Sequence, residues 1–165
     1  MEVIGYFGIG SNIGNREENL IKALEYIAKK YKIIELSSLY NTEAVGFTDQ
    51  DDFLNMVVKV DTTGEDPFKI LSYIKSIEKM MGRKDTVKWG PRIIDIDILY
   101  IEGIYLRTET LNIPHISLLK RDFVLIPLSE LARYLEIDGK LFDIMDYITN
   151  KLKVELYKTR EKIEL

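Results

Sequence analysis

The sequence of 165 residues contains no cysteine, a single histidine, His115, a single tryptophan, Trp89, and only four prolines. The absence of cysteine excludes disulfides, thiolate zinc sites and cysteine nucleophiles, so any metal ion must bind oxygen ligands or His115. No stretch approaches the roughly 18 to 20 consecutive apolar residues of a membrane span, and the N-terminus lacks the basic and apolar regions of a secretion signal. These absences lead us to expect a cytoplasmic protein with no membrane partner.

The composition is that of an ordinary globular protein, with 46 % apolar and 30 % charged residues. A chain of this length fits one domain, so we expect a single domain over residues 1–165. The net charge of -4 argues against a protein that coats nucleic acid, and nothing in the sequence requires an oligomer. We therefore expect a monomer that acts on small molecules.

Hydrophobic periodicity predicts alternating strands and helices. Asn15 and Asp66 are suited to cap the two helices, and Pro67 fits a first helical turn. The expected segments are strands at 3–9, 33–40, 53–60 and 93–101, helices at 16–31 and 67–82, a helical stretch at 123–131, and a helix and final strand from 142 onward. The order β-α-β-β-α-β predicts an α+β fold, a ferredoxin-like sandwich with an antiparallel sheet and C-terminal helix and strand additions. In that fold the helices cover one face of the sheet, and a ligand groove is expected on the other.

A local excess of positive charge runs into two carboxylates. Residues 79–92 carry five Lys or Arg against one acid, and Asp95 and Asp97 follow on a predicted strand. Residues i and i+2 of a strand project from the same face, so the two aspartates can share metal ions. Magnesium needs only one or two carboxylates when substrate phosphates complete its shell. The alternative is a solvated loop followed by an exposed strand face with two outward acids.

The stretch from Trp89 to Leu99, WGPRIIDIDIL, resembles the signature of the 6-hydroxymethyl-7,8-dihydropterin pyrophosphokinase family of folate biosynthesis. The likeness extends over most of the chain, through GIGSN at 8–12, DFLN at 52–55, Gly82-Arg83, Pro114-His115, RDFVL at 121–125 and Pro127-Leu128. The resemblance implies the ferredoxin-like fold and transfer of a pyrophosphoryl group from ATP to the hydroxymethyl oxygen of the pterin, with release of AMP. The chain has no room for a fused folate enzyme, so we expect a free-standing pyrophosphokinase.

The resemblance also implies roles around the nucleotide. Asp95 and Asp97 match the family pair that holds two Mg²⁺ ions, and Arg83 and Arg92 match catalytic arginines. The other positions implied to bind ATP are Glu78, Lys84, Lys88, Trp89, Ile98, His115 and Arg121. The alternatives are that Glu78 is an exposed helix acid and that His115 is a packed or exposed residue without function.

For the pterin, the resemblance implies that Phe53 and Phe123 sandwich the ring while Asn55 reads its polar edge. Thr42, Val45 and Gly46 would complete the pocket. The alternative for Phe53 is a place in the hydrophobic core. Gly8-x-Gly10 is no dinucleotide fingerprint, because Ile13 stands where the third glycine is required, and the sequence has no Walker A motif.

The basic segment 82–88 is expected to close over the substrates, and either Lys84 or Lys88 would bring its charge inward. Thr110 and Ile116 stand where some family members have arginine and tyrosine, so nucleotide affinity would depend on Arg83, Arg92 and Arg121. A non-catalytic ligand-binding module of the same fold is the competing hypothesis, and it needs no paired carboxylates. A nucleic-acid-binding sheet conflicts with the net charge.

Overall fold

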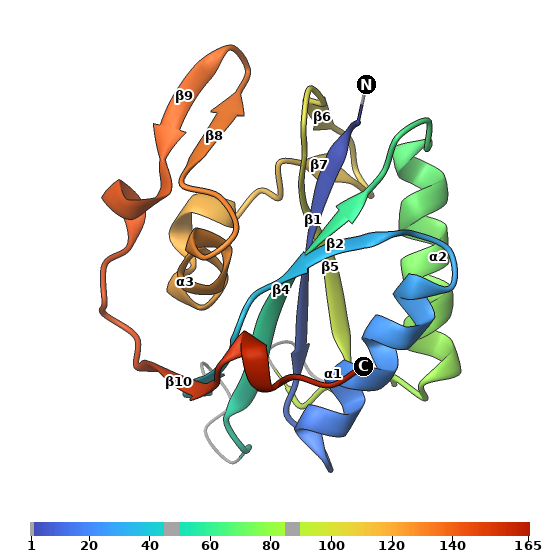
Figure 1. The fold of residues 1–165 in the computed structure, drawn as a ribbon, viewed down its shortest axis with the longest axis vertical. Helices are drawn as coiled ribbons and strands as arrows, with labels where there is room; N and C mark the ends of the chain where they lie inside the picture. The colour runs from blue at the N-terminus through green and yellow to red at the C-terminus, as the bar shows by residue number, and fades with distance from the viewer. Residues whose placement is uncertain (1, 45–49, 85–89) are drawn as a thin grey trace.

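The computed structural model describes residues 2–44, 50–84 and 90–165, and Figure 1 shows their arrangement. The first part of the chain forms β1 (Ile4–Ser11), α1 (Arg16–Ala28), β2 (Ile33–Leu36), β3 (Leu39–Thr42), β4 (Phe53–Asp61), α2 (Pro67–Met80) and β5 (Asp95–Ile101). The second part forms β6 (Leu106–Arg107), β7 (Asn112–Ile113), η1 (Leu118–Lys120), α3 (Asp122–Ser129), β8 (Tyr134–Ile137), β9 (Lys140–Asp143), η2 (Ile144–Tyr147), β10 (Val154–Lys158) and η3 (Arg160–Lys162). None of the helices in these ranges is long and apolar enough to cross a membrane.

The main sheet is antiparallel, as the sequence predicts. Its strands follow the spatial order β10-β3-β4-β1-β5, and β2 pairs with β4 beside β3. Two small hairpins, β6-β7 and β8-β9, lie outside this sheet. The first strand of the chain therefore occupies the middle of the sheet, between β4 and β5, which places it at the centre of any site built on either face.

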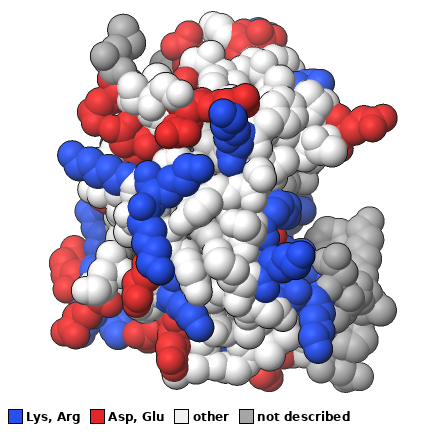
Figure 2. Space-filling view, turned by 90° about the vertical axis from the view of Figure 1, so that its right-hand side faces the viewer, with Lys and Arg blue, Asp and Glu red and all other residues white. Residues whose placement is uncertain are grey.

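Local signals set the two long helices. The side chain of Asn15 accepts a hydrogen bond from the Glu18 N–H at 3.1 Å, and that of Asp66 accepts one from the Phe68 N–H at 2.9 Å. Both residues are therefore N-caps, as predicted. α1 and α2 cover one side of the sheet and α3 lies on the other (Figure 1). On the outer surface near α1 and α2, basic and acidic side chains are interspersed (Figure 2).

Two hydrophobic cores follow from the alternation of side chains along the strands. Phe7 and Ile9 of β1 face α1 and α2 and are fully or almost fully buried, whereas Tyr6 belongs to the core under α3. Gly8 and Gly10 share the face of Tyr6. The pairing of β1 with β5 shifts register between Tyr6 and Phe7, so that Leu99 joins the α3 side as well as its neighbour Tyr100.

Two predictions about secondary structure are wrong. The predicted strand 33–40 is divided into β2 and β3 because Ser37 replaces regular pairing: its hydroxyl accepts the Val57 N–H and donates to the Ser38 carbonyl, each at 2.8 Å. The predicted helix from 142 onward is also absent, since residues 142 to 165 form the end of β9, two short 3-10 helices and β10. The chain reverses between β8 and β9 at Asp138 and Gly139, which both have positive φ. Backbone of that kind matches the twist of a two-residue β-turn and leads into a strand.

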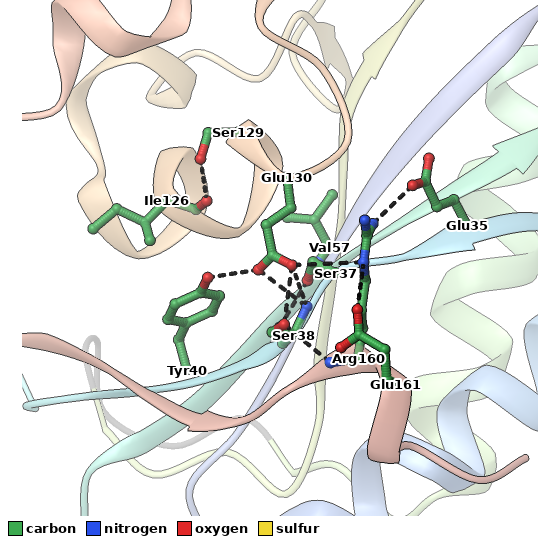
Figure 3. A network of polar contacts seen from close by, with 10 residues as sticks. All are labelled: Glu35, Ser37, Ser38, Tyr40, Val57, Ile126, Ser129, Glu130, Arg160 and Glu161. Carbon is green, nitrogen blue, oxygen red and sulfur yellow. Dashed lines mark hydrogen bonds and ion pairs between the residues drawn. The ribbon is translucent and has the colours of Figure 1, made fainter.

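A polar network anchors the end of α3 to the break between β2 and β3 (Figure 3). The carboxylate of Glu130 accepts hydrogen bonds from the Ser38 N–H and hydroxyl and, at 2.5 Å, from the hydroxyl of Tyr40. Arg160 joins from the C-terminal segment: its N–H donates to the Ser38 hydroxyl and its guanidinium forms an ion pair with Glu35 at 2.7 Å. α3 is therefore fixed to the sheet by hydrogen bonds as well as by apolar packing.

Candidate active site

A cavity of about 230 Å³ opens on the face of the sheet away from α1 and α2. Its floor comes from β1, β4 and β5, and the start of α3 closes one side. The predicted site residues that line it are Thr42, Phe53, Asn55, Arg83, Arg92, Asp95, Asp97, Arg121 and Phe123. Residues separated by up to about 80 positions in the sequence are thus brought to one place.

The two carboxylates of β5 face this cavity. Asp95 and Asp97 alternate with Ile96 and Ile98, which pack into the core under α1 and α2. Burial and, to a smaller extent, the neighbouring charge of Asp95 raise the pKa of Asp97 to about 7, against the opposing effect of Arg121. A pKa near 7 leaves this carboxyl only partly ionised at neutral pH, and further positive charge beside it favours the ionised form.

Arg83 connects the carboxylate pair to α2. Its Nη1 lies 2.9 Å from Asp95 Oδ1 and 2.5 Å from Glu78 Oε2. Glu78 is only 4 % exposed, accepts the Ile96 N–H at 2.9 Å and contacts Lys75 at 3.1 Å. Glu78 is therefore no exposed helix acid, and it does not line the cavity. It holds Arg83 against Asp95 instead.

Asn12 holds the backbone of Arg92 in place. The sequence motifs did not predict a role for this residue. Its Oδ1 accepts the Arg92 N–H at 2.7 Å, and its N–H donates to the Arg92 carbonyl at 3.0 Å. The Asn12 amide also donates to Gln50 Oε1 at 2.7 Å and to the Asp51 carbonyl at 3.1 Å. One buried side chain therefore joins the segments on both sides of the cavity. Its place in the GIGSN stretch, directly after β1, was the available signal.

The aromatic part of the cavity contains unsatisfied polar atoms. Phe53 comes from the sheet and Phe123 from the start of α3, where the Arg121 guanidinium lies 5.6 Å from the centre of the Phe123 ring. Asn55 Oδ1, Thr42 Oγ1 and Arg83 Nε are buried, and none of them has a hydrogen-bond partner among residues 2–44, 50–84 and 90–165. Buried polar atoms are nearly always paired in native proteins. Three such atoms at one cavity indicate a ligand that donates and accepts hydrogen bonds.

Several predicted residues lie elsewhere. Ile98 faces the helices and is 4 % exposed, so any contact with a nucleotide would have to use its backbone. Lys84 is exposed and does not line the cavity. Val45, Gly46, Lys88 and Trp89, with the predicted closure of segment 82–88, lie wholly or partly outside the described residues.

His115 lies beside the cavity without lining it. Its backbone N–H donates to the Leu99 carbonyl at 2.7 Å, and its ring Nδ1 accepts the Ser117 N–H at 3.1 Å. Burial lowers the pKa of His115, and the charge of Arg121 lowers it further. The imidazole is therefore neutral near pH 7, with Nδ1 as an acceptor and Nε2 as the donor.

The mixed α/β fold with its antiparallel sheet carries a cavity that joins carboxylates and arginines to a ring-lined recess, and such a cavity is suited to an enzyme that acts on small molecules. Residues 6–133 match the family described as 7,8-dihydro-6-hydroxymethylpterin-pyrophosphokinase (HPPK). The chain belongs to this family, as its motifs indicate. The activity of the family is pyrophosphoryl transfer in folate biosynthesis.

Relatives support this assignment along most of the chain. The 2-amino-4-hydroxy-6-hydroxymethyldihydropteridine pyrophosphokinase of Aquifex aeolicus is 44 % identical over 76 % of this chain and 78 % of its own length. The Bacillus subtilis protein of the same name is 40 % identical over 82 % of each chain. The folic acid synthesis protein FOL1 of Dictyostelium discoideum is 37 % identical over 93 % of this chain, which spans only 22 % of that protein.

The fold is shared with solved structures. A crystal structure of wild-type Plasmodium falciparum HPPK-DHPS with pteroate superposes with a TM-score of 0.67 over 90 % of this chain, at 18 % identity. The present chain spans 42 % of that protein. The family match ends at residue 133, so a superposition over 90 % of the chain includes residues beyond the matched range.

Proposed function

We propose that this cavity binds ATP and 6-hydroxymethyl-7,8-dihydropterin side by side and transfers the terminal pyrophosphoryl group of ATP to the hydroxymethyl oxygen, releasing AMP. The observation that supports it is the division of one cavity by β1. On one side of β1 lie Phe53, Asn55 and Thr42, and on the other lie Asp95 and Asp97. Arg121 and Phe123 come from the start of α3. The donor and acceptor of the group would thus meet over the central strand.

Asp95 and Asp97 would hold two Mg²⁺ ions. Among residues 2–44, 50–84 and 90–165 there is no group of three or more His, Cys, Asp or Glu suited to a metal ion, so this pair is the candidate. Two carboxylates on one face fit Mg²⁺, which takes its other ligands from water and phosphate oxygens. When bound, Mg²⁺ would lower the pKa of the attacking hydroxyl and neutralise charge on the phosphates. Arg121, by opposing the raised pKa of Asp97, helps keep that carboxyl ionised as a ligand.

The arginines would bind the triphosphate and stabilise charge that develops on its oxygens. The guanidinium of Arg83 donates to Glu78, and that of Arg92 donates to the carbonyls of Gly90 at 3.1 Å and Pro91 at 3.0 Å, so both guanidinium groups are already ordered when the nucleotide arrives. Arg121 lies at the start of α3, where it faces both Phe123 and the carboxylates. His115 would donate from Nε2 to a phosphate oxygen. Lys84, Lys88 and Trp89 remain proposed contacts of the nucleotide.

The pterin would lie between Phe53 and Phe123, since offset stacking suits a flat heterocycle. Asn55 offers both an amide donor and an unpaired acceptor, and Thr42 Oγ1 is unpaired close by. Val45 and Gly46 are proposed to complete this recess. The core strand order β3-β4-β1-β5, with both long helices on one face, supports the ferredoxin-like class for the fold. We also propose a single-domain, monomeric, cytoplasmic enzyme.

The experiment is chromatographic. The protein is incubated with ATP, Mg²⁺ and 6-hydroxymethyl-7,8-dihydropterin, and the nucleotide products are separated. AMP that appears only with the pterin, without ADP, is the expected result. ADP would indicate single phosphoryl transfer, and measurable pterin binding without turnover would favour the ligand-binding module. Glu25→Gln, an exposed acid on α1, serves as the variant with unchanged activity.

A further inference from the structure

The floor of the cavity between its two halves is bare backbone. Gly8 and Gly10 lie on the cavity face of β1 and line the cavity. In the sheet register Gly10 is the partner of Asn55 on β4 and of Asp95 on β5, and Gly8 is the partner of Val57 and Asp97. About two strand spacings, roughly 9 to 10 Å, therefore separate Asn55 from Asp95, with only Gly10 between them. The Gly8-x-Gly10 pattern, which no dinucleotide motif explains, occupies the boundary between the two proposed substrates.

Gly10 is glycine for reasons of space. Among the described residues, the glycines with positive φ are Gly14, Gly64, Gly82, Gly103 and Gly139. Gly10 is not one of them, so its backbone is one that alanine also adopts. A Cβ at Gly10, however, would lie 2.7 Å from Nδ2 of Asn55, with Phe53 Cδ1 at 3.7 Å. The amide of Asn55 must move if position 10 carries any side chain.

This displacement would affect recognition more than folding. The atom that a Cβ would meet is the end of a side chain, which can rotate away at little cost to the sheet. The same amide carries an acceptor, Oδ1, that is buried without a partner. A site that hydrogen-bonds its ligand loses much of its affinity when those groups are misplaced, because the groups then stay buried and unpaired.

We propose that Gly10 is a positioning residue for the pterin: it seats the Asn55 amide and leaves the floor flat where the ring and its hydroxymethyl group cross towards Asp95. The inference rests on the proposed function, since it takes Asn55 as the group that reads the pterin edge.

Another glycine of the same strand supplies a matched control. A Cβ at Gly5 would lie 2.7 Å from Cγ2 of Thr62, the same close approach, but Gly5 does not line the cavity. Gly5→Ala therefore disturbs β1 to a similar degree without touching Asn55. Gly8→Ala is a milder probe of the floor, since its Cβ would lie 3.3 Å from the two terminal carbons of Leu99.

The test is a fluorescence titration with 6-hydroxymethylpterin in the presence of Mg²⁺ and a non-hydrolysable ATP analogue. For Gly10→Ala we expect pterin binding weaker by about tenfold or more, and for Gly5→Ala a change of less than about twofold. The affinity for the ATP analogue alone should stay within about twofold of wild type in both variants. Equal pterin affinity in wild type and Gly10→Ala overturns the inference, while failure of the wild type to bind pterin overturns the proposed function instead.

A double-mutant cycle separates positioning from general damage. In an Asn55→Ala background no amide remains to be displaced, so adding Gly10→Ala should weaken pterin binding by less than about twofold further. Full additivity of the two losses would contradict the role assigned to Gly10. If Gly10→Ala alone does not fold, the double variant should fold because the clashing group is gone. Failure of the double variant as well would make Gly10 a structural residue only and overturn the inference.

Discussion

The two faces of the central sheet are made by the same strands and differ in almost every physical respect. Towards α1 and α2, β5 presents Ile96 and Ile98, which are at most 4 % exposed and pack in a continuous aliphatic core. Towards the cavity the same strand presents Asp95 and Asp97. Because side chains alternate, adjacent residues separate the two tasks. The face towards α1 and α2 is therefore apolar along β5, whereas the cavity face carries a destabilised carboxyl and lies beside the second hydrophobic core, under α3.

The largest effect on the cavity face is expected from a substitution at Asp97. Asp97→Ala should reduce the rate of AMP formation by about a thousandfold or more, because a proposed metal ligand is lost. The stability of this variant near pH 8 should be equal to or above that of wild type, since an unfavourably buried charge is removed. The rate of AMP formation and urea unfolding, measured on the same preparation, test the expected loss of activity and the expected stability. Full activity of Asp97→Ala would refute the metal assignment.

On the opposite face, Ile98→Ala should have the reverse effect. Truncation of a buried isoleucine leaves a cavity in the core and should cost about 3 kcal/mol of unfolding free energy. Affinity for an ATP analogue, measured well below the unfolding transition, should change by less than about twofold, as expected for backbone contact only. A large loss of nucleotide affinity in the folded variant would show that the Ile98 side chain contributes directly.

The pH dependence of stability sharpens the contrast within β5. The pKa of Asp97 is raised to about 7, so the folded state holds the proton more tightly than the unfolded state does. The free energy of unfolding should therefore fall as the pH rises from about 4 to about 7, and the loss should be complete above that range. Relative to Asp97→Asn, wild type without Mg²⁺ should lose on the order of 2 kcal/mol between pH 5 and pH 8.

Urea unfolding at several pH values measures this difference. Mg²⁺ competes with the proton for the same carboxyl, so added Mg²⁺ should stabilise wild type more at pH 8 than at pH 5. Parallel pH profiles for wild type and Asp97→Asn would count against a raised pKa at this position.

The smallest expected effect on stability concerns the polar network that joins the end of α3 to the sheet. Tyr40→Phe removes the hydrogen bond to Glu130 and should cost about 1 kcal/mol, because Glu130 keeps the two donors of Ser38. Tyr40 does not line the cavity, so KM for the pterin should stay unchanged. A shift in that KM without a change in stability would mean that the network in Figure 3 also tunes the recess.

Much of the fold could be predicted from local rules. The caps at Asn15 and Asp66 and the alternation around Asp95 and Asp97 depend only on near neighbours in sequence, and the structure confirms them. The hairpin at Asp138-Gly139 was also readable, since this dipeptide is a strong turn signal, but the apolar residues after it were interpreted as a helix.

Other features required contacts that no local pattern contains. The break at Ser37 depends on Val57, and the burial of Glu78 depends on Arg83 and the Ile96 N–H. A single sequence without an alignment could place Glu78 on a helix but could not show which side of that helix was covered. The roles of Asn12 and Gly10 likewise became visible only when β4 and β5 were placed on either side of β1.

The last strand of the sheet also determines how this protein meets other molecules. β10 has only five residues, its register shifts between Leu156 and Lys158, and the charged pair Lys153 and Glu155 lies at its start. A short, irregular, charged edge offers an incoming strand few consecutive backbone groups for pairing. The C-terminal segment thus forms one edge of the sheet, and at that edge the protection from edge-to-edge aggregation comes from residues that take no part in the proposed chemistry.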